Sequence, residues 1–301
     1  QLIYWDYNFR EEMTQSLPEL EEECDRLFKQ AVSRQTVSDV GISSYLSGGI
    51  DSGAITAIAA GHIPNMQTFT VGFDTRSASG LELGFDEREK SEFMSYQFQT
   101  EHYEMVLKAG DMERAMGPLV HHLEEPRVGQ SYPNFYAAKL SSRFGKVVLA
   151  GTGGDELFGG YPWRYYRAVA SENFEHYIDQ YYAFWGRLMP NASLEKVFAP
   201  IWGDVKHVCT HEIFRSVFKR DAENLTRPED YVNHSLHFEA KTFLHGLLVV
   251  EDKLSMAHSL EVRVPFLDND LVDFAQTIPA KYKLKALDKV VNMDEIEIGK
   301  L

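Results

Sequence analysis

Residues 40–52 read VGISSYLSGGIDS, an apolar run that breaks into two glycines flanked by serines and followed by one acid. We interpret the run as a buried strand and the break as a phosphate-binding loop. Gly48 and Gly49 let a ligand approach the backbone closely, so consecutive N–H groups can turn toward one anion where the next helix begins. Ser47 and Ser52 add hydroxyl donors, and the helix adds the positive end of its dipole. A phosphate-bearing ligand is therefore predicted at this loop.

Asp51 lies inside the predicted loop, where its carboxylate would repel a phosphate unless a cation separated the two. We therefore predict that Asp51 is a Mg²⁺ ligand. The loop is not the familiar P-loop, because it lacks the G-x-x-x-x-G-K-S/T spacing and the lysine of that motif. On its own, a glycine-serine stretch of this kind could also be an ordinary turn.

A second apolar run followed by glycines and acids lies further along the chain. Residues 146–161 read KVVLAGTGGDELFGGY, and the first five of them form a predicted strand. Glycine density at the carboxyl end of a strand, opposite the first loop, suits a crevice that holds a nucleotide. In such a crevice, Asp155 is predicted to bind the same Mg²⁺ ion as Asp51.

Hydrophobic periodicity predicts alternating strands and helices in the first half of the chain. The predicted helices cover residues 11–38, 53–60, 86–99, 111–122 and 130–142, and the predicted strands cover residues 40–46, 67–73, 102–107 and 146–150. Residues 74–85 are predicted to form a loop, and Gly61 is a suitable C-cap. The alternation favours a parallel sheet with right-handed crossovers.

The second half of the chain is aromatic-rich from Tyr161 onward, and its pattern predicts helices. We expect most of the aromatic side chains to be core residues, and we predict one continuous helix across residues 241–253. The chain then divides into a lead-in helix (residues 1–38), a nucleotide-binding α/β core (residues 39–160) and a helical part (residues 161–301).

Composition limits the function classes. The chain has 301 residues, of which 44% are hydrophobic, and this is ample for a packed core. Its formal net charge of −15 would repel a nucleic-acid backbone, so nucleic acid is not expected as a partner. No stretch approaches ~18 uninterrupted apolar residues and no signal pattern is seen, so we expect a cytoplasmic protein that does not bind membranes. Cys24 and Cys209 fit neither a zinc pattern nor a disulfide framework and are expected to pack as small apolar side chains.

The S-G-G-x-D-S pattern of residues 47–52 resembles the loop of the ATP pyrophosphatases, which cleave ATP to AMP and pyrophosphate. Two further blocks narrow the resemblance, GGDELFGGY at residues 153–161 and SMAHSLEVRVPFLD at residues 255–268. With the three blocks in the same order, the sequence resembles the synthetase domain of the glutamine-hydrolysing asparagine synthetases. The resemblance implies an α/β fold with a doubly wound parallel sheet, of the adenine-nucleotide alpha-hydrolase-like PP-loop type, and a largely helical C-terminal half.

The resemblance also implies ATP and Mg²⁺ as cofactors and assigns site residues. Those implied to bind ATP or pyrophosphate are Leu46, Ser47, Gly48, Gly49, Asp51, Ser52, Val71, Gly151 and Lys253. Those implied in catalysis are Lys253, Thr152 and Asp155, and those implied in substrate binding are Glu125, Glu156 and Arg263. In the family the main chain near Val71 would contact the adenine and Lys253 would be directed at the pyrophosphate. By its neighbours alone, Lys253 beside two acids would be a solvated surface group.

Thr152 departs from the family pattern. Asparagine synthetases have at this position a glutamate that assists attack by the amine, whereas a threonine hydroxyl cannot act as a general base near neutral pH. Related enzymes that close β-lactam rings place a tyrosine there, supported by an acid elsewhere. The position therefore varies with the reaction, and the identity of the carboxylate substrate stays open. Glu125, His122 and His258 are alternatives for the base.

Three functions follow from these observations. The first is an asparagine synthetase-like ligase that converts aspartate to β-aspartyl-AMP and then, with ammonia, to asparagine. The second applies the same adenylation chemistry to another carboxylate, as in a specialised amidotransferase or a lactam or peptide cyclase, and Thr152 is its main support. The third is a non-catalytic nucleotide-binding regulator, against which the intact acids, Lys253 and the phosphate loop argue.

The expected partners are small molecules and a glutaminase domain or subunit. In the resembled family a glutaminase domain precedes a segment like residues 4–6, and Gln1 is not a plausible native start. We therefore expect either a fragment of a longer protein or a protein whose ammonia is delivered otherwise. The sequence does not determine the oligomeric state, for which a homodimer is one option.

Overall fold

The computed structural model describes residues 2, 4–77, 84–125, 131–169, 171–186, 189–218, 225, 227–285 and 287, except for the side chains of residues 166–168. The chain forms two compact units, each assembled from segments that are distant in the sequence. The first, called the sheet unit, comprises Pro18–Gly154 and Leu244–Phe274. The second, called the helical unit, comprises Gln1–Leu17, Asp155–Phe243 and Ala275–Leu301. Our sequence-based division, by contrast, used three consecutive segments, residues 1–38, 39–160 and 161–301.

The sheet unit contains a five-stranded parallel sheet. Its strands are β1 Ile42–Tyr45, β2 Gln67–Phe73, β3 Glu101–Leu107, β4 Val147–Leu149 and β5 Glu261–Arg263, in the order β3-β2-β1-β4-β5. The chain builds outward from β1 to β3 and then adds β4 on the other side of β1. Doubly wound proteins bind their ligands at the carboxyl ends of the strands where the order reverses, which are β1 and β4 in this sheet. The predicted doubly wound α/β fold is confirmed.

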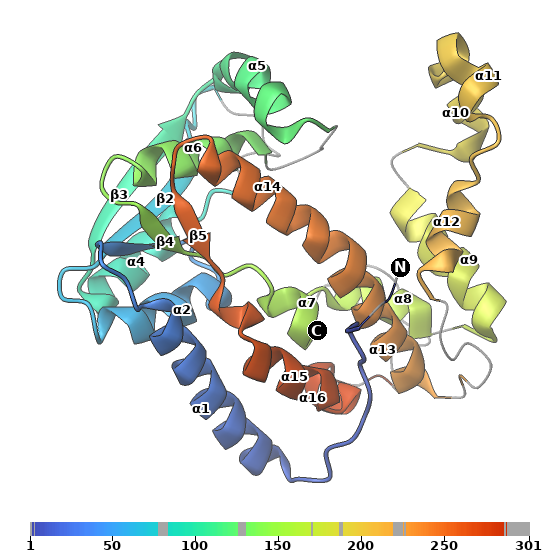
Figure 1. Cartoon of the computed structure of the whole chain (residues 1–301), viewed down its shortest axis with the longest axis horizontal. Helices are drawn as coiled ribbons and strands as arrows, with labels where there is room; N and C mark the ends of the chain where they lie inside the picture. The colour runs from blue at the N-terminus through green and yellow to red at the C-terminus, as the bar shows by residue number, and fades with distance from the viewer. Residues whose placement is uncertain are drawn as a thin grey trace. The chain divides into compact units, whose positions relative to one another are not determined.

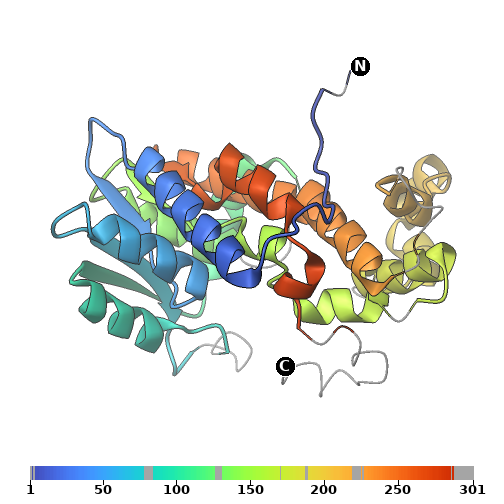
Figure 2. The same ribbon diagram turned by 90° about the horizontal axis from the view of Figure 1, so that it is seen from below.

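Helices cover both faces of this sheet (Figures 1 and 2). The helices of the sheet unit are α1 Leu17–Gln35, α2 Ile50–Ala60, α4 Arg88–Phe98, α5 Asp111–Leu123, α6 Ser131–Ser141, α14 Leu244–Met256 and α15 Asn269–Thr277, with a 3-10 turn at Pro265–Leu267. Helices α2 and α4 pack on β1 to β3, α6 packs on β2 and β3, and α14 packs on α5, α6 and β5. Right-handed crossovers change face where the strand order reverses, so both faces become covered.

The helical unit is built around an aromatic core, as the aromatic-rich segment predicted. Its helices are α7 Gly154–Phe158, α8 Pro162–Val169, α9 Phe174–Trp185, α10 Leu194–Val197, α11 Trp202–Val205, α12 Thr210–Ser216, α13 Pro228–Phe238 and α16 Ala280–Lys283, with 3-10 turns at Asn191–Ser193 and Ala199–Ile201. A π-helical turn, Glu239–Phe243, follows α13 directly. The core rings are Tyr177, Tyr181, Phe184, Phe214, Phe218, Tyr231 and Phe238. Because such rings bury a large apolar area, this cluster holds α9, α12 and α13 together.

Strand β2 has the predicted bounds, whereas helix α1 begins at Leu17 rather than at residue 11. The N–H of Arg10 donates to the carbonyl of Gln276 (2.9 Å), and the N–H of Glu12 donates to the carbonyl of Thr277 (3.4 Å). Residues 10–12 are therefore bonded to a distant part of the helical unit instead of continuing the helix.

Two other predictions need correction, and one strand was missed. Helix α2 begins at Ile50, three residues before the predicted start, so the glycine loop passes directly into it. Strand β5 was not predicted, because three residues are too few to show an alternating pattern. The helix predicted across residues 241–253 begins as the π-helical turn, which the period of the apolar residues did not reveal. Residues 78–83 of the predicted loop and Gln130 of a predicted helix lie outside the described residues.

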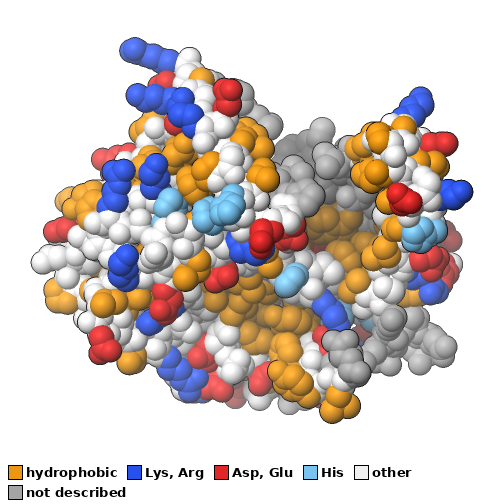
Figure 3. Space-filling model, turned by 45° about the horizontal axis from the view of Figure 1, so that its top comes forward, with side chains coloured by type: hydrophobic (Ala, Val, Ile, Leu, Met, Phe, Trp, Pro, Cys, Tyr) orange, Lys and Arg blue, Asp and Glu red, His pale blue; other side chains and the backbone are white. Residues whose placement is uncertain are grey.

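The described residues also show features of the surface and of the two cysteines. The helices within these residues include no candidate membrane span. Acidic and basic side chains are intermingled on the face shown in Figure 3. Both cysteines are free, but Cys209 is exposed at the start of α12, so the expectation that it packs as an apolar side chain is wrong, whereas Cys24 is half-buried.

Helix α14 offers a stability test with an internal control. Leu254 is fully buried in a cluster with Leu119, Leu123 and Phe135, whereas the Met256 side chain on the same helix is exposed. We expect Leu254→Ala to lower the free energy of unfolding by about 2–5 kcal/mol, and Met256→Ala to change it by less than about 0.5 kcal/mol. Urea denaturation measures both. Equal losses for the two variants would contradict the packing of α14 described above.

Candidate functional site

The predicted phosphate loop connects β1 to α2 in the sheet unit. The N–H of Leu46 donates to the Phe69 carbonyl (2.9 Å), and the N–H of Ser47 donates to the Ser52 hydroxyl (3.1 Å). The Ser47 and Ser52 hydroxyls lie 3.1 Å apart, and the N–H of Gly49 donates to the Ser47 hydroxyl (3.4 Å). The loop thus folds over the first turn of α2. Its serine hydroxyls lie where the helix dipole favours an anion.

Gly48 cannot be replaced by another residue without strain. Its φ is +82°, and an added Cβ would lie 2.6 Å from the Cβ of Lys90 and 3.1 Å from the Glu87 carbonyl oxygen. The loop is therefore seated against the beginning of α4. Lys90 is mostly exposed, with its ammonium 3.7 Å from the Glu87 carboxylate. Lys90 is a cation near the loop that sequence reasoning missed, because its position forty residues downstream carries no motif.

The second glycine loop meets the first where the sheet order reverses. Strand β4 pairs with β1, so the two loops leave adjacent strands. A Cβ on Gly151 would lie 3.0 Å from the Asp51 Cβ, and a Cβ on Gly154 would lie 2.7 Å from the Asp51 carboxyl carbon. The glycines therefore let the Asp51 carboxylate lie directly against the main chain of the second loop. Thr152, half-buried, occupies the turn between them.

Asp155 and Glu156 begin the short helix α7, in the helical unit. A Cβ on Gly160 would lie 1.8 Å from the Asp155 Oδ1, so this carboxylate packs against the main chain at Gly160. The Tyr161 hydroxyl donates to the Glu156 Oε1 (2.7 Å), and the Glu156 side chain is buried. Burial raises the pKa of both carboxyls, and the Tyr161 hydroxyl and the Arg164 charge oppose this rise. The predicted substrate residue Glu156 is thus an internal, hydrogen-bonded carboxylate.

Lys253, on α14, contacts the end of α5. Its ammonium donates to the Leu123 carbonyl (2.8 Å) and lies 3.1 Å from the Glu124 Oε2. Glu124 is the left-handed C-cap of α5 (φ +59°), and Glu125 follows it as an exposed residue. The described contacts of Lys253 therefore connect it with the segment that leads to Glu125, and not with the serines of the phosphate loop.

Arg263, on β5, binds the end of α1. Its Nη1 donates to the carbonyls of Gln35 and Val37 (2.8 Å each), and its Nε lies 2.7 Å from the Glu261 Oε1. These contacts fasten the last turn of α1 to the edge strand of the sheet. The described contacts give Arg263 a structural part, and its predicted role in binding substrate stays a prediction.

The main chain near Val71, which the family resemblance assigns to adenine, lies beside an ion pair. Val71 pairs with Met105 within the sheet, and a Cβ on the next residue, Gly72, would lie 2.1 Å from the Arg88 Nε. Arg88 also forms an ion pair with Asp86 (2.8 Å). Hydrogen bonds from Arg88 lower the pKa of Asp86, despite partial burial. The Arg88 guanidinium therefore lies against the end of β2. After Lys90, Arg88 is a second cation in this region that no sequence motif revealed.

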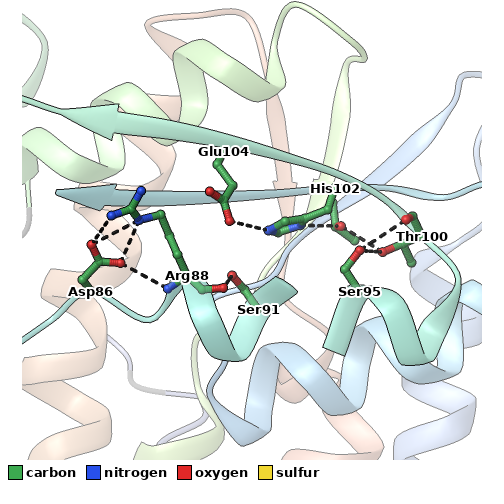
Figure 4. A network of polar contacts seen from close by, with 8 residues as sticks. Asp86, Arg88, Ser91, Ser95, Thr100, His102 and Glu104 are labelled. Carbon is green, nitrogen blue, oxygen red and sulfur yellow. Dashed lines mark hydrogen bonds and ion pairs between the residues drawn. The ribbon is translucent and has the colours of Figure 1, made fainter. Parts of the chain in front are cut away.

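Figure 4 shows this ion pair and a second set of polar contacts around His102 on β3. Arg88 donates to the Phe73 carbonyl (3.0 Å), which ties the start of α4 to the end of β2. On β3, the His102 ring bonds the Thr68 hydroxyl (2.9 Å) and lies 3.6 Å from the Glu104 carboxylate. Burial lowers the pKa of His102, so the neutral ring is favoured. The Arg88 contacts fix the start of α4, and the phosphate loop is seated against that part of α4.

The two histidines considered as bases, His122 and His258, each contact another ring. The rings of His121 and His122 lie 5.0 Å apart, and His258 packs on Phe135 (4.5 Å) with its pKa lowered by burial. Among the described residues, no group of three or more His, Cys, Asp or Glu side chains could hold a metal ion. Mg²⁺ commonly needs just one or two carboxylates together with substrate phosphates and water. The Asp51 carboxylate beside a phosphate loop has the donor chemistry for such an ion.

Comparison with known proteins agrees with this geometry. The family model for asparagine synthase matches residues 23–292. A Mycobacterium bovis protein named "Putative asparagine synthetase (glutamine-hydrolyzing)" is 30% identical over 299 residues, which cover 87% of this chain and 43% of the relative. Asparagine synthetase (glutamine-hydrolyzing) 3 of Bacillus subtilis is 29% identical over 303 residues, covering 93% of this chain and 46% of the relative.

The chain spans less than half the length of these two relatives. The family model nevertheless covers both glycine loops and the block around Arg263. With the doubly wound sheet and the meeting of its two loops at Asp51, this match shows that the chain belongs to the asparagine synthase family.

Proposed function

We propose that the chain catalyses ATP-dependent amide formation, as a carbon-nitrogen ligase. A carboxylate is joined to AMP with release of pyrophosphate, and ammonia then displaces AMP. The observation that carries this proposal is the Asp51 carboxylate, held against the main chain of Gly151 and Gly154 beside a serine-lined loop at the start of α2. The names of the relatives, glutamine-hydrolyzing asparagine synthetases, support the same class of reaction.

The chemistry explains the need for such a loop. A free carboxylate is a poor acylating agent, because its leaving group would be oxide, whereas AMP is a good leaving group. The carboxylate oxygen attacks the α-phosphorus of ATP, and negative charge builds on the departing pyrophosphate. The loop N–H groups and the Ser47 and Ser52 hydroxyls are proposed to stabilise this charge by fixed hydrogen bonds, the main source of catalysis in phosphoryl transfer.

Asp51 and Asp155 are proposed as the Mg²⁺ ligands. When bound, Mg²⁺ would neutralise charge on the phosphate oxygens and hold them in position. Lys253 is proposed to bind the pyrophosphate. To do so its ammonium would leave the Leu123 carbonyl and Glu124, and the flexible four-carbon stem of lysine makes such a movement accessible.

Aspartate is the proposed carboxylate, which would give β-aspartyl-AMP and then asparagine. Thr152 favours a second candidate, the same adenylation of another carboxylate, because the chain lacks the glutamate that asparagine synthetases use at this position. Ammonia is proposed to come from a glutaminase domain or subunit, as the names of the relatives suggest.

The deciding experiment follows pyrophosphate release from Mg·ATP in the presence of ammonium, with and without aspartate. We expect release that depends on aspartate and is accompanied by asparagine. ATP binding without aspartate-dependent release would reject aspartate as the substrate and direct the search to other carboxylates.

Replacing Asp51 tests the catalytic reading against a non-catalytic regulator. We expect Asp51→Asn to lower pyrophosphate release by roughly 100-fold or more, the usual scale for losing one charge-stabilising group. Asp25→Asn is the matched control, because Asp25 is an exposed acid of α1 paired with Lys29. The control should keep full activity. Unchanged release by the Asp51 variant would argue against the proposed metal site.

Gly154 tests the approach of the two loops. An added methyl group at Gly154 would lie 2.7 Å from the Asp51 carboxyl, so Gly154→Ala must displace one of the loops. A displacement of about 1 Å can cost on the order of 100-fold in rate, and we expect a loss of that order in pyrophosphate release. The matched control is Gly117→Ala in α5, where a Cβ would meet nothing within 4 Å. Equal activity of the two variants would contradict the described contact at Asp51.

A further inference from the structure

The helical unit contains a buried ion pair that the proposed chemistry does not use. The Glu239 side chain is fully buried, and its Oε2 lies 2.7 Å from the Nη1 of Arg164, which is itself nearly buried. The Tyr181 hydroxyl donates to the other oxygen of Glu239. Glu239 opens the π-helical turn after α13, and π-helical turns are frequent at functional sites.

Arg164 extends this pair toward helix α7. Its guanidinium lies 3.9 Å from the ring centre of Tyr161 and 4.3 Å from that of Phe243, at the other end of the π-helical turn. The Tyr161 hydroxyl donates to the buried carboxylate of Glu156 (2.7 Å). A continuous series of contacts therefore runs from Glu239 through Arg164 and Tyr161 to Glu156, the residue next to Asp155.

Stability alone is a weak explanation for this series. Burying an ion pair costs the hydration of both charges, and a well-packed apolar replacement is often as stable. Burial here raises the pKa of Glu239 to about 7, although Arg164 and Tyr181 oppose the rise. Arg164 contacts both the Glu239 carboxylate and the Tyr161 ring, and the Tyr161 hydroxyl bonds Glu156 at the start of α7. Arg164 and Tyr161 thus connect the buried carboxylate of Glu239 with that of Glu156.

We propose that Glu239 is a positioning residue for Asp155, the proposed metal ligand in the first turn of α7. Through Arg164 and Tyr161 it holds Glu156, and thereby sets the orientation of the adjacent Asp155. The inference rests on the proposed function, because it takes Asp155 as a Mg²⁺ ligand. Loss of a residue that hydrogen-bonds and orients a metal ligand typically lowers metal affinity by about 10–100-fold.

The test measures Mg²⁺ dependence apart from activity. ATP binding is followed by calorimetry at increasing Mg²⁺ concentration, in mildly alkaline buffer where Glu239 is ionised, and thermal unfolding is recorded for each variant. We expect Glu239→Gln and Tyr161→Phe each to raise the Mg²⁺ concentration for half-maximal ATP binding by about tenfold. The double variant should be no worse than the more affected single variant, because the two residues act along one route.

Tyr181→Phe is the matched control. Like Tyr161→Phe it removes one phenol hydroxyl bonded to a buried glutamate, but Tyr181 bonds Glu239 Oε1, whereas Arg164 bonds Oε2 and continues the series toward Glu156. It should lower thermal stability and leave the Mg²⁺ dependence unchanged. The proposal is overturned if Tyr161→Phe leaves that dependence unchanged, or if Tyr181→Phe shifts it as much. Failure of the wild-type protein to bind ATP in a Mg²⁺-dependent way would instead reject the proposed function, and this inference with it.

Discussion

The contact between the Asp51 carboxylate and the main chain of the second glycine loop is the constraint on which the site depends. It needs glycine at positions 151 and 154, since a Cβ at either would lie 3.0 Å or less from Asp51. It also needs β4 to pair directly with β1, so that both loops leave adjacent strands. The reversal of strand order therefore brings two loops a hundred residues apart to one place, and the serines and helix dipole of the first loop make that place suitable for an anion.

The helical unit holds charged groups inside an apolar region. Three aromatic rings, those of Tyr161, Trp185 and Phe243, surround the Arg164 guanidinium at 3.9 to 5.0 Å. An arginine in such a setting is stabilised by the ring faces as well as by its carboxylate partner, because guanidinium is weakly hydrated and stacks on aromatic rings. Because the Arg164 and Glu239 side chains are buried, their orientation depends on a few direct contacts.

The sequence predicted those features whose cause is local. Glycines at the ends of apolar runs predicted both loops. The apolar pattern of residues 67–73 predicted the bounds that β2 has in the structure. Features that depend on distant contacts were missed. The β5 strand exists because it pairs with β4, the π-helical turn places both Glu239 and Phe243 against Arg164, and Arg88 and Lys90 reach the loop region through the packing of α4. The predicted helix at residue 11 failed for the same reason, since its backbone bonds residues 276 and 277.

The discontinuity of the two units has a consequence for how the chain acquires its structure. The sheet cannot be completed until residues 261–263 are available, because β5 pairs with β4 more than a hundred positions earlier. The core of the sheet unit likewise needs Leu254 of α14 to cover α5 and α6. Contacts between residues this far apart in the sequence carry a large loop-closure entropy cost, so they make folding slower. A ribosome-bound chain that ended near residue 240 would expose the apolar sides of α5 and α6 together with one unpaired edge of β4, so the synthesis of α14 and β5 decides when the sheet unit becomes safe from aggregation.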